Sequence, residues 1–176
     1  MTWRPPFSIS PEAITLIAEI SALVERYAIR IEQQDGLLLR KVNKIKTIHA
    51  SLAIEGNTLQ ESQVTDILDG KPVIAPLREI QEVKNAIAVY DLARELDPFS
   101  VKDLLKAHAL LMAALLEDAG RFRHGGVGVF SGGEAVHIAP PAEMVPILIK
   151  DLFDWMKKAK DHLLIRSCVF HYEFEF

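Results

Sequence analysis

The sequence predicts an all-α fold that carries one small β-hairpin. Apolar residues recur at three-and-four spacing in seven separate segments, and this spacing is typical of amphipathic helices. Between Val127 and Ile138 the period changes, because two short apolar runs flank Gly132-Gly133. A Gly-Gly pair permits the positive φ angles of a tight hairpin turn. We therefore expect about seven helices and a single β element.

The first predicted helix begins after Ser10, whose side chain can cap it. Pro11 occupies the first turn, where its missing N–H costs nothing. Asp35-Gly36 breaks the helix. One face is predicted to be buried, and it carries Ile14, Ile17, Ile20, Val24, Tyr27, Ala28 and Ile31.

The second predicted helix runs into Gly56-Asn57, and a short third helix follows it. Thr58 and Glu61 form a capping-box pattern that predicts the start of the third helix, and Asp69-Gly70 stops it. A loop with two prolines comes next. The apolar positions of these two helices are Leu38, Val42, Ile45, Ile48 and Leu52, then Val64, Ile67 and Leu68.

The fourth and fifth predicted helices are separated by Asp97-Pro98. Ser100 caps the fifth helix, which is expected to continue to Gly120. Their apolar faces carry Ile80, Val83, Ile87 and Tyr90, then Leu104, Leu105, His108, Leu111, Met112 and Leu115.

Two helices are predicted after the hairpin, which Ala139-Pro140-Pro141 ends. Their apolar positions are Met144, Ile147, Leu148, Leu152 and Trp155, then Ile165, Cys168, Val169, Tyr172 and Phe176. No glycine, asparagine or proline stops the last helix. We therefore expect the chain to be part of a longer protein.

Composition bounds the class of protein. The chain has 176 residues, a formal net charge of −4 and a single cysteine, Cys168. This length suits one domain, or one domain with a helical extension. The acidic balance disfavours nucleic-acid binding. One cysteine excludes an intramolecular disulfide, and no run of about 18 apolar residues occurs, so we expect a cytoplasmic protein that does not span a membrane.

Several residues that could carry chemistry have simpler explanations. His171 and Glu175 can share a helix face, but two groups do not make a metal site, and we expect no metal. His108 is expected to be a hydrogen-bonded core histidine, and Cys168, predicted to be buried, is weak support for a nucleophile. Neither Gly-Gly pair forms a phosphate-binding loop. A small cluster before the hairpin could hold phosphate, although a solvated loop is the simpler interpretation: Arg121, Arg123 and His124.

Glu55 stands at the end of the second predicted helix, directly before Gly56-Asn57. A carboxylate at this end of a helix is disfavoured by the helix dipole, so Glu55 needs solvent or a cationic partner. The simplest interpretation is a helix C-terminus with Gly56 as its left-handed cap.

Three segments in order resemble a known family. The first is Ser51-x-x-x-Glu55-Gly56-Asn57. The second runs from Leu105-Lys106-Ala107-His108 through Ala119-Gly120-Arg121-Phe122-Arg123 and the hairpin to Ile138-Ala139-Pro140-Pro141. The third is His171-Tyr172-Glu173-Phe174-Glu175-Phe176. Together they resemble the Fic (filamentation induced by cAMP) family, in the subgroup whose inhibitory helix precedes the catalytic core.

The resemblance implies a Fic-like helical fold and a protein adenylyltransferase, which transfers AMP from ATP, with Mg²⁺, to a hydroxyl of a target protein. The family signature, His-x-Phe-x-x-Gly-Asn-Gly-Arg-x-x-Arg, does not occur in this sequence. In the family its histidine is the base and its arginines fix the polyphosphate. We therefore assign no catalytic residue here, His171 included. The chain as given is predicted to transfer no AMP and to bind no ATP tightly.

Two functional parts carry over by position. Ser51, Glu55 and Gly56 match the inhibitory motif, in which the glutamate pairs with the last arginine of the signature. The hairpin matches the flap on which a target docks as an added strand. The flap residues are Val127, Gly128, Val129, Phe130, Val136, His137 and Ile138. Residues 1–98 would form an N-terminal helical region with the inhibitory helix, and residues 99–176 an incomplete Fic core that includes the flap.

Other functions stay open at this point. The chain could be a non-catalytic interaction module whose hairpin edge pairs with partner strands. It could also belong to a DNA-associated regulator, since relatives of this subgroup often carry a C-terminal winged-helix module. Family relatives often associate as dimers, which makes a homodimer a further expectation.

Overall fold

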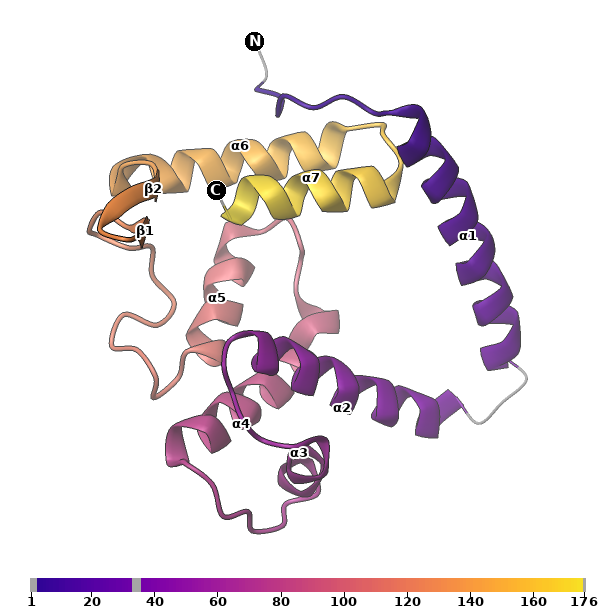
Figure 1. Ribbon diagram of the computed structural model, residues 1–176, viewed down its shortest axis with the longest axis vertical. Coiled ribbons are helices and arrows are strands. Elements are labelled where there is room, and N and C mark those ends of the chain that lie inside the picture. The colour runs from indigo at the N-terminus through magenta and orange to yellow at the C-terminus, as the bar shows by residue number, and fades with distance from the viewer. Residues whose placement is uncertain (1–2, 33–35, 176) are drawn as a thin grey trace. The chain divides into compact units, whose positions relative to one another are not determined.

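The computed structural model describes residues 3–32 and 36–175, and of residues 29–32 and 36–39 it describes the backbone alone. Within these ranges it contains seven α-helices and one antiparallel hairpin, which confirms the predicted fold class (Figure 1). The helices are α1 Pro11–Glu32, α2 Gly36–Ile54, α3 Glu61–Leu68, α4 Leu77–Leu92, α5 Val101–Leu111, α6 Val145–Lys158 and α7 Leu163–Glu175. The strands are β1 Gly128–Ser131 and β2 Glu134–Ile138, and short 3₁₀ helices follow α4 and precede α6.

The chain divides into two compact units. The helical unit consists of Ser10–Glu95 and Ala107–Ala119. The hairpin unit consists of Met1–Ile9, Leu96–Lys106 and Gly120–Phe176. Each unit is described by itself.

The core of the helical unit lies between α2, α3 and α4. It consists of Ile45, Ile48, Leu59, Val64, Val83 and Ala86. Ion pairs join α2 to its neighbours at the surface, with Lys41 Nζ 2.6 Å from Asp69 Oδ1 and Lys44 Nζ 2.5 Å from Asp91 Oδ1. The hydrogen bond from Lys41 lowers the pKa of Asp69. Burial of the six apolar core residues, rather than these surface ion pairs, is the main contribution to the stability of the helical unit.

A buried asparagine fixes the end of α5. Asn85 on α4 donates from Nδ2 to the carbonyl oxygens of Leu111 at 3.0 Å and Ala113 at 2.8 Å. Its Oδ1 accepts from Gln81 at 2.8 Å. The prediction that this helix continues to Gly120 was wrong, because these carbonyls bond to Asn85 and the chain turns away after Leu111.

Helix α1 starts as predicted but does not bury its apolar face. Ser10 Oγ accepts the backbone N–H of Ala13 at 3.2 Å. The prediction of a buried face was wrong, because the core of the helical unit closes between α2, α3 and α4 without α1. Ile17 is half-buried, whereas Ile14, Ile20, Val24, Tyr27 and Ala28 are exposed. The side chain of Ile31 and the break at Asp35 lie outside what the structure describes.

The start of α3 also differs from its prediction. The Thr58–Glu61 capping box was wrong, because Thr58 donates from both its backbone N–H and its hydroxyl to Glu79 Oε2 on α4, at 2.6 and 2.8 Å. The helix begins two residues after Leu59, at Glu61, and Gln63 Oε1 accepts the N–H of Gln60 at 2.9 Å. A long-range partner therefore displaced the local cap.

In the hairpin unit, α6 and α7 lie side by side and the N-terminal segment packs on α6 (Figure 1). The buried residues of α6 are Ile149, Leu152, Phe153 and Trp155. Phe153 stacks on Phe170 of α7 with ring centroids 6.0 Å apart. Phe7 meets Trp155 edge-on at 6.1 Å. Cys168, predicted to be buried, is exposed, because α7 presents Phe170 rather than Cys168 to α6.

Candidate functional site

The end of α2 carries Glu55 in a Schellman turn. The N–H of Gly56 donates to the carbonyl of Ala53 at 3.1 Å, and the N–H of Asn57 donates to that of Leu52 at 3.0 Å. These bonds satisfy carbonyls that a helix end leaves without partners. Gly56 has a φ angle of +89°, which glycine adopts without the Cβ clash of other residues. The predicted left-handed cap at Gly56 is confirmed.

The chain directly after this turn is fastened to α4. Asn57 Nδ2 donates to Glu82 Oε2 at 2.9 Å and to the carbonyl of Glu79 at 3.2 Å. Asn57 Oδ1 accepts the N–H of Leu59 at 3.1 Å. Together with the two bonds from Thr58 to Glu79, these contacts hold the turn against α4. Glu55 is therefore presented by a turn that is fixed on both sides.

Glu55 and Ser51 line the same hollow of about 440 Å³ in the helical unit. Its walls are otherwise mostly apolar and come from α2, α4, the 3₁₀ turn after α4 and the end of α5: Ile48, Leu52, Ala86, Val89, Tyr90, Ala93 and Leu111. Both Glu55 and Ser51 are exposed. The structure thus brings the two predicted inhibitory side chains together at the rim of an apolar depression.

The carboxylate of Glu55 forms no hydrogen bond or ion pair with any described residue. It stands at the helix end where backbone carbonyls already concentrate negative potential. A carboxylate in this position attracts a cation, and a guanidinium can bind it in a bidentate manner. The apolar walls beneath it could accept the aliphatic stem of such a side chain.

The second predicted element, the flap, is a hairpin in the hairpin unit. Gly132 and Gly133 have φ angles of +60° and +87°, as a primed two-residue turn requires. The paired residues are Gly128 and Ile138, Val129 and His137, Phe130 and Ala135, and Ser131 and Glu134. The pairing skips Val136, so β2 carries one extra residue as a bulge.

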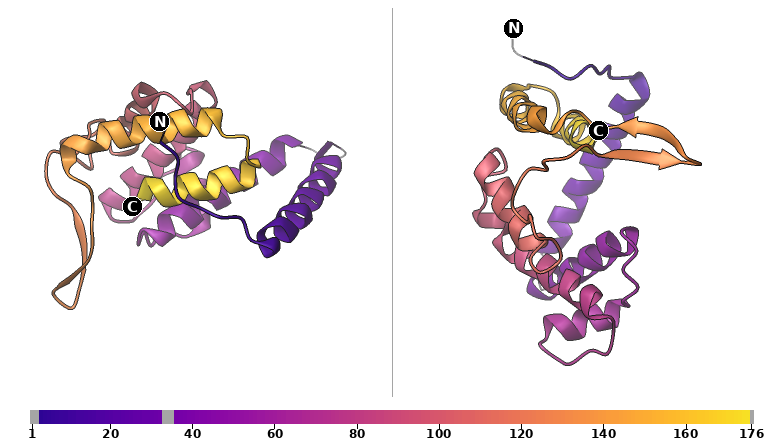
Figure 2. Two further views of the ribbon diagram at one scale, coloured as in Figure 1. Left: turned by 90° about the horizontal axis from the view of Figure 1, so that it is seen from above. Right: turned by 90° about the vertical axis from the view of Figure 1, so that its left-hand side faces the viewer.

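The apolar side chains of the flap face solvent. Val127, Val129, Phe130, Val136 and Ile138 are all exposed, and Ile138 reaches 72%. Figure 2 shows the two strands extending away from α6 as an arm. A two-stranded sheet leaves backbone N–H and C=O groups unpaired along its outer edges, and an extended peptide can add there as a strand. His137 and Gly128 are half-buried.

Comparison with known proteins shows which family the chain resembles. A family model, the Fic/DOC family, matches residues 98–176. A crystal structure of a Fic family protein from Desulfovibrio desulfuricans G20 is 50% identical to the chain with a TM-score of 0.92, and the match covers 99% of this chain. The chain belongs to the Fic family.

A second solved structure, Fic-1 from C. elegans, is 24% identical with a TM-score of 0.66 over 92% of this chain, which supports the Fic fold alone. Among curated proteins, none matches at a significant level. This Fic chain covers 54% of the Desulfovibrio structure and 55% of the C. elegans one. It therefore spans about half the length of the relatives that it matches.

Arg123, which the sequence analysis grouped with a possible phosphate site, instead binds backbone carbonyls at the base of the flap. Arg123 donates from Nη1 to the carbonyl of Gly125 at 2.8 Å and from Nη2 to the carbonyl of Pro140. The N–H of Ala139 donates to the carbonyl of Val127 at 2.9 Å and closes the stem of the hairpin. Because both of these guanidinium donors are used by the backbone, Arg123 is a positioning residue for the flap.

We expect Arg123→Leu to loosen this stem. The substitution removes two hydrogen bonds from a charged donor, each worth about 1.5–3 kcal/mol. Amide hydrogen exchange at Ala139 should become about tenfold faster or more, since about 1.4 kcal/mol changes an opening equilibrium tenfold. Exchange within α4, in the helical unit, serves as the internal control. An unchanged rate at Ala139 would contradict the bracing role.

The remaining predicted residues lie apart from these elements. His171 Nε2 is 3.3 Å from Glu175 Oε1 on the exposed side of α7, as the spacing predicted. His108 is half-buried on α5. Over the described ranges, His, Cys, Asp and Glu form no group of three or more that could hold a metal. None of the helices described is long and apolar enough to cross a lipid bilayer.

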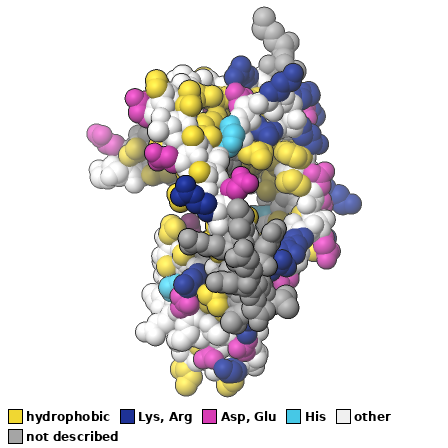
Figure 3. Space-filling model, turned by 90° about the vertical axis from the view of Figure 1, so that its right-hand side faces the viewer, with side chains coloured by type: hydrophobic (Ala, Val, Ile, Leu, Met, Phe, Trp, Pro, Cys, Tyr) yellow, Lys and Arg dark blue, Asp and Glu magenta, His cyan; other side chains and the backbone are white. Residues whose placement is uncertain are grey.

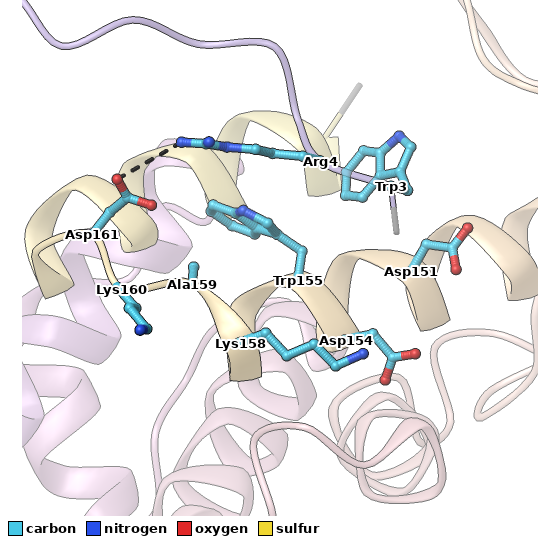
Figure 4. A pocket seen from close by; sticks show the side chains of 9 residues that line it. All are labelled: Trp3, Arg4, Asp151, Asp154, Trp155, Lys158, Ala159, Lys160 and Asp161. Carbon is cyan, nitrogen blue, oxygen red and sulfur yellow. Dashed lines mark ion pairs between the residues drawn. The ribbon is translucent and has the colours of Figure 1, made fainter. Parts of the chain in front are cut away.

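Sequence reasoning missed a hollow of about 650 Å³ beside Trp155. Figure 4 shows Trp3 and Arg4, from the N-terminal segment, above Trp155 of α6, with Arg4 and Asp161 3.9 Å apart. Three acidic and three basic side chains line it: Asp151, Asp154, Asp161, Arg4, Lys158 and Lys160. Since the two signs balance, the hollow favours neither an anion nor a cation. No sequence motif marks it, because its residues come from two distant segments.

Proposed function

We propose that this chain carries the inhibitory helix and the target-docking flap of a Fic protein adenylyltransferase, which transfers AMP from ATP to a hydroxyl of a target protein. The family membership supports a protein-modifying enzyme in general. The observation that carries the finer proposal is the carboxylate of Glu55, which is exposed, lacks a described partner and is held by a turn fastened to α4.

In this proposal Glu55 acts by binding a cation. Its two oxygens are acceptors, so they form a bidentate pair with an arginine that would otherwise hold the polyphosphate. The same negative charge repels a phosphate group that approaches the turn. Ser51 lies one helical turn before Glu55 on α2 and shares its hollow, so its role would be local packing.

The flap would select the target. A target segment adds as a strand along the hairpin edge, and its side chains pack beside the exposed Val129, Phe130 and Ile138. Main-chain hydrogen bonds would align the segment, and the apolar side chains would choose among sequences. Residues 1–98 would then carry the regulation and residues 99–176 part of the Fic core.

We propose that the 176 residues by themselves hold no ATP and Mg²⁺. The Fic signature is not among the 176 residues, and within the part that the structure describes no group of three or more possible metal ligands occurs. We therefore derive no catalytic step from this chain. In this proposal the chain contributes the inhibitory carboxylate of Glu55 and the hairpin edge on which a target docks.

A second candidate function is a non-catalytic interaction module, and the exposed apolar flap favours it. Such a module would bind extended peptides without any dependence on nucleotide. We also propose a cytoplasmic location, because the only cysteine, Cys168, is exposed and a reducing compartment keeps such a thiol free.

The two functions are separated by joining residues 1–176 to a Fic segment that carries the family signature. The joined protein should transfer labelled AMP from ATP to protein, whereas residues 1–176 alone should transfer none. Replacing the signature histidine by alanine is the control for transfer by the joined segment. If the folded joined protein modifies no protein in a cell lysate yet binds extended peptides, the interaction module is the correct function.

A further inference from the structure

Helix α1 has an apolar stripe that is largely exposed, and the core of the helical unit does not include it. Its large apolar residues repeat at intervals of seven: Leu16 and Leu23, Ile17 and Val24, and Ile20 and Tyr27. Leu23 and Val24 are each 60% exposed, and Leu16 and Tyr27 are about half exposed. In Figure 3, which faces the right-hand side of Figure 1, hydrophobic side chains are visible at the surface. An apolar stripe with a seven-residue repeat is the pattern of helices that pair in coiled coils.

The charged residues that flank the stripe, Glu19 and Arg26, indicate which kind of helix could pair with it. In heptad terms, Ile20 and Tyr27 occupy a, Leu16 and Leu23 occupy d, and Ile17 and Val24 occupy e. The g positions carry Glu19 and Arg26, which have opposite charges. Both are exposed, and neither forms an ion pair with a described residue.

This pattern distinguishes the two directions in which helices pair. In a parallel pair, e of one helix faces g of the other, so apolar Ile17 and Val24 would face charged residues. In an antiparallel pair, e faces e and g faces g. The apolar e residues then meet each other, and Glu19 of one copy meets Arg26 of the other.

We propose that α1 is a self-association surface that pairs antiparallel with α1 of a second copy of this chain. Full overlap of two helices that run from Pro11 to Glu32 places the two-fold axis between residues 21 and 22. In that register Leu16 packs on Tyr27 of the second copy and Ile20 packs on its Leu23. Every large residue of the stripe is covered, and two Glu19–Arg26 pairs flank the contact.

The register follows from one helix alone and does not depend on the proposed enzymatic function. A helix of 22 residues is about 33 Å long, which gives four a–d layers along the pair. The hydroxyl of Tyr27 accepts from Asn43 Nδ2 of α2 at 3.2 Å, so one end of the stripe is held in place before pairing.

The first test is the mass of the 176-residue chain by sedimentation equilibrium. We expect twice the chain mass of 19.7 kDa, with reversible dissociation on dilution. Leu23→Ser should weaken the dimer about tenfold or more by removing a central apolar contact. Ile14→Ser is the matched control, because Ile14 is also 60% exposed but occupies heptad position b, outside the a, d and e positions of the stripe. A wild-type monomer, or equal loss in both variants, would overturn the proposal.

The second test fixes the direction of pairing. Glu19→Arg and Arg26→Glu should each weaken the homodimer about tenfold, since like charges then meet at two places. Mixing the two single variants should restore association, because opposite charges meet again in the mixed antiparallel pair. In a parallel pair these two positions do not face each other. No recovery in the mixture would therefore exclude the antiparallel arrangement.

Discussion

Replacing Glu55 by glycine in the joined, signature-bearing protein should raise the rate of AMP transfer about tenfold or more. The carboxylate is proposed to occupy the arginine that otherwise holds the polyphosphate. A charge-assisted bidentate pair is worth about 1.5–3 kcal/mol, and about 1.4 kcal/mol corresponds to a tenfold change. The initial rate of labelled AMP incorporation at saturating ATP measures the effect.

Two further variants separate charge from backbone effects. Glu55→Gln keeps the shape of the side chain and removes its charge, so it should also raise the rate. Glu61→Gln is the matched control, because Glu61 is likewise exposed but lies in the first turn of α3, outside the hollow. If both Glu55 variants transfer AMP at the wild-type rate, Glu55 has no inhibitory role, while the AMP-transfer proposal itself stands.

Asn85→Ala should lower the free energy of unfolding by about 2–4 kcal/mol. The substitution leaves the carbonyls of Leu111 and Ala113 without the donor that fixes the end of α5. Buried polar groups that lose their partners cost about 1–3 kcal/mol each. Urea unfolding of the 176-residue chain, followed by circular dichroism, measures the loss.

Asn43→Ala is the control for this prediction. Asn43 is an exposed asparagine whose hydrogen bond to Tyr27 is open to water, so its loss should change the stability by about 0.5 kcal/mol or less. Asn85→Asp also removes the donor and directs a carboxylate at two carbonyls, so it should be at least as destabilising as alanine. Equal effects of Asn43→Ala and Asn85→Ala would show that the buried network does not fix α5.

Local patterns predicted the helices and the hairpin well. Ser10 caps α1, Ser100 caps α5 through the N–H of Asp103 at 3.2 Å, and Gly132-Gly133 forms the turn of the flap. These features depend on residues within four positions of one another. The stop of α2 at Gly56 belongs to the same class.

Features that depend on distant residues were not predictable. Thr58 pairs with Glu79 rather than with Glu61, and Asn85 ends a helix that lies 26 residues further along the chain. The apolar periodicity of α1 predicted a buried face, but most of the residues assigned to that face are exposed. Periodicity cannot show whether a partner element covers a stripe.

The candidate site was predicted in part. The sequence singled out Glu55 because a carboxylate at that end of a helix needs solvent or a cation, and the structure leaves it in solvent. Helix α4 lines the hollow next to Glu55 and accepts the hydrogen bond of Asn57 that anchors the turn. No sequence motif predicts that α4 packs there. Arg123 was grouped by charge, yet two backbone carbonyls determine its role.

The extra residue at Val136 limits how a target strand could align with β2. A regular edge lets an incoming strand slide by two residues and recover the same hydrogen bonds. At Val136 the alternation of donors and acceptors is broken, so a strand that slides past it loses its ladder. The fixed register would then determine which target hydroxyl is the acceptor, by its number of residues from the side chain that anchors the target strand. Under the proposed function, this alignment would present the same residue position of each target for modification, even in targets of unrelated sequence.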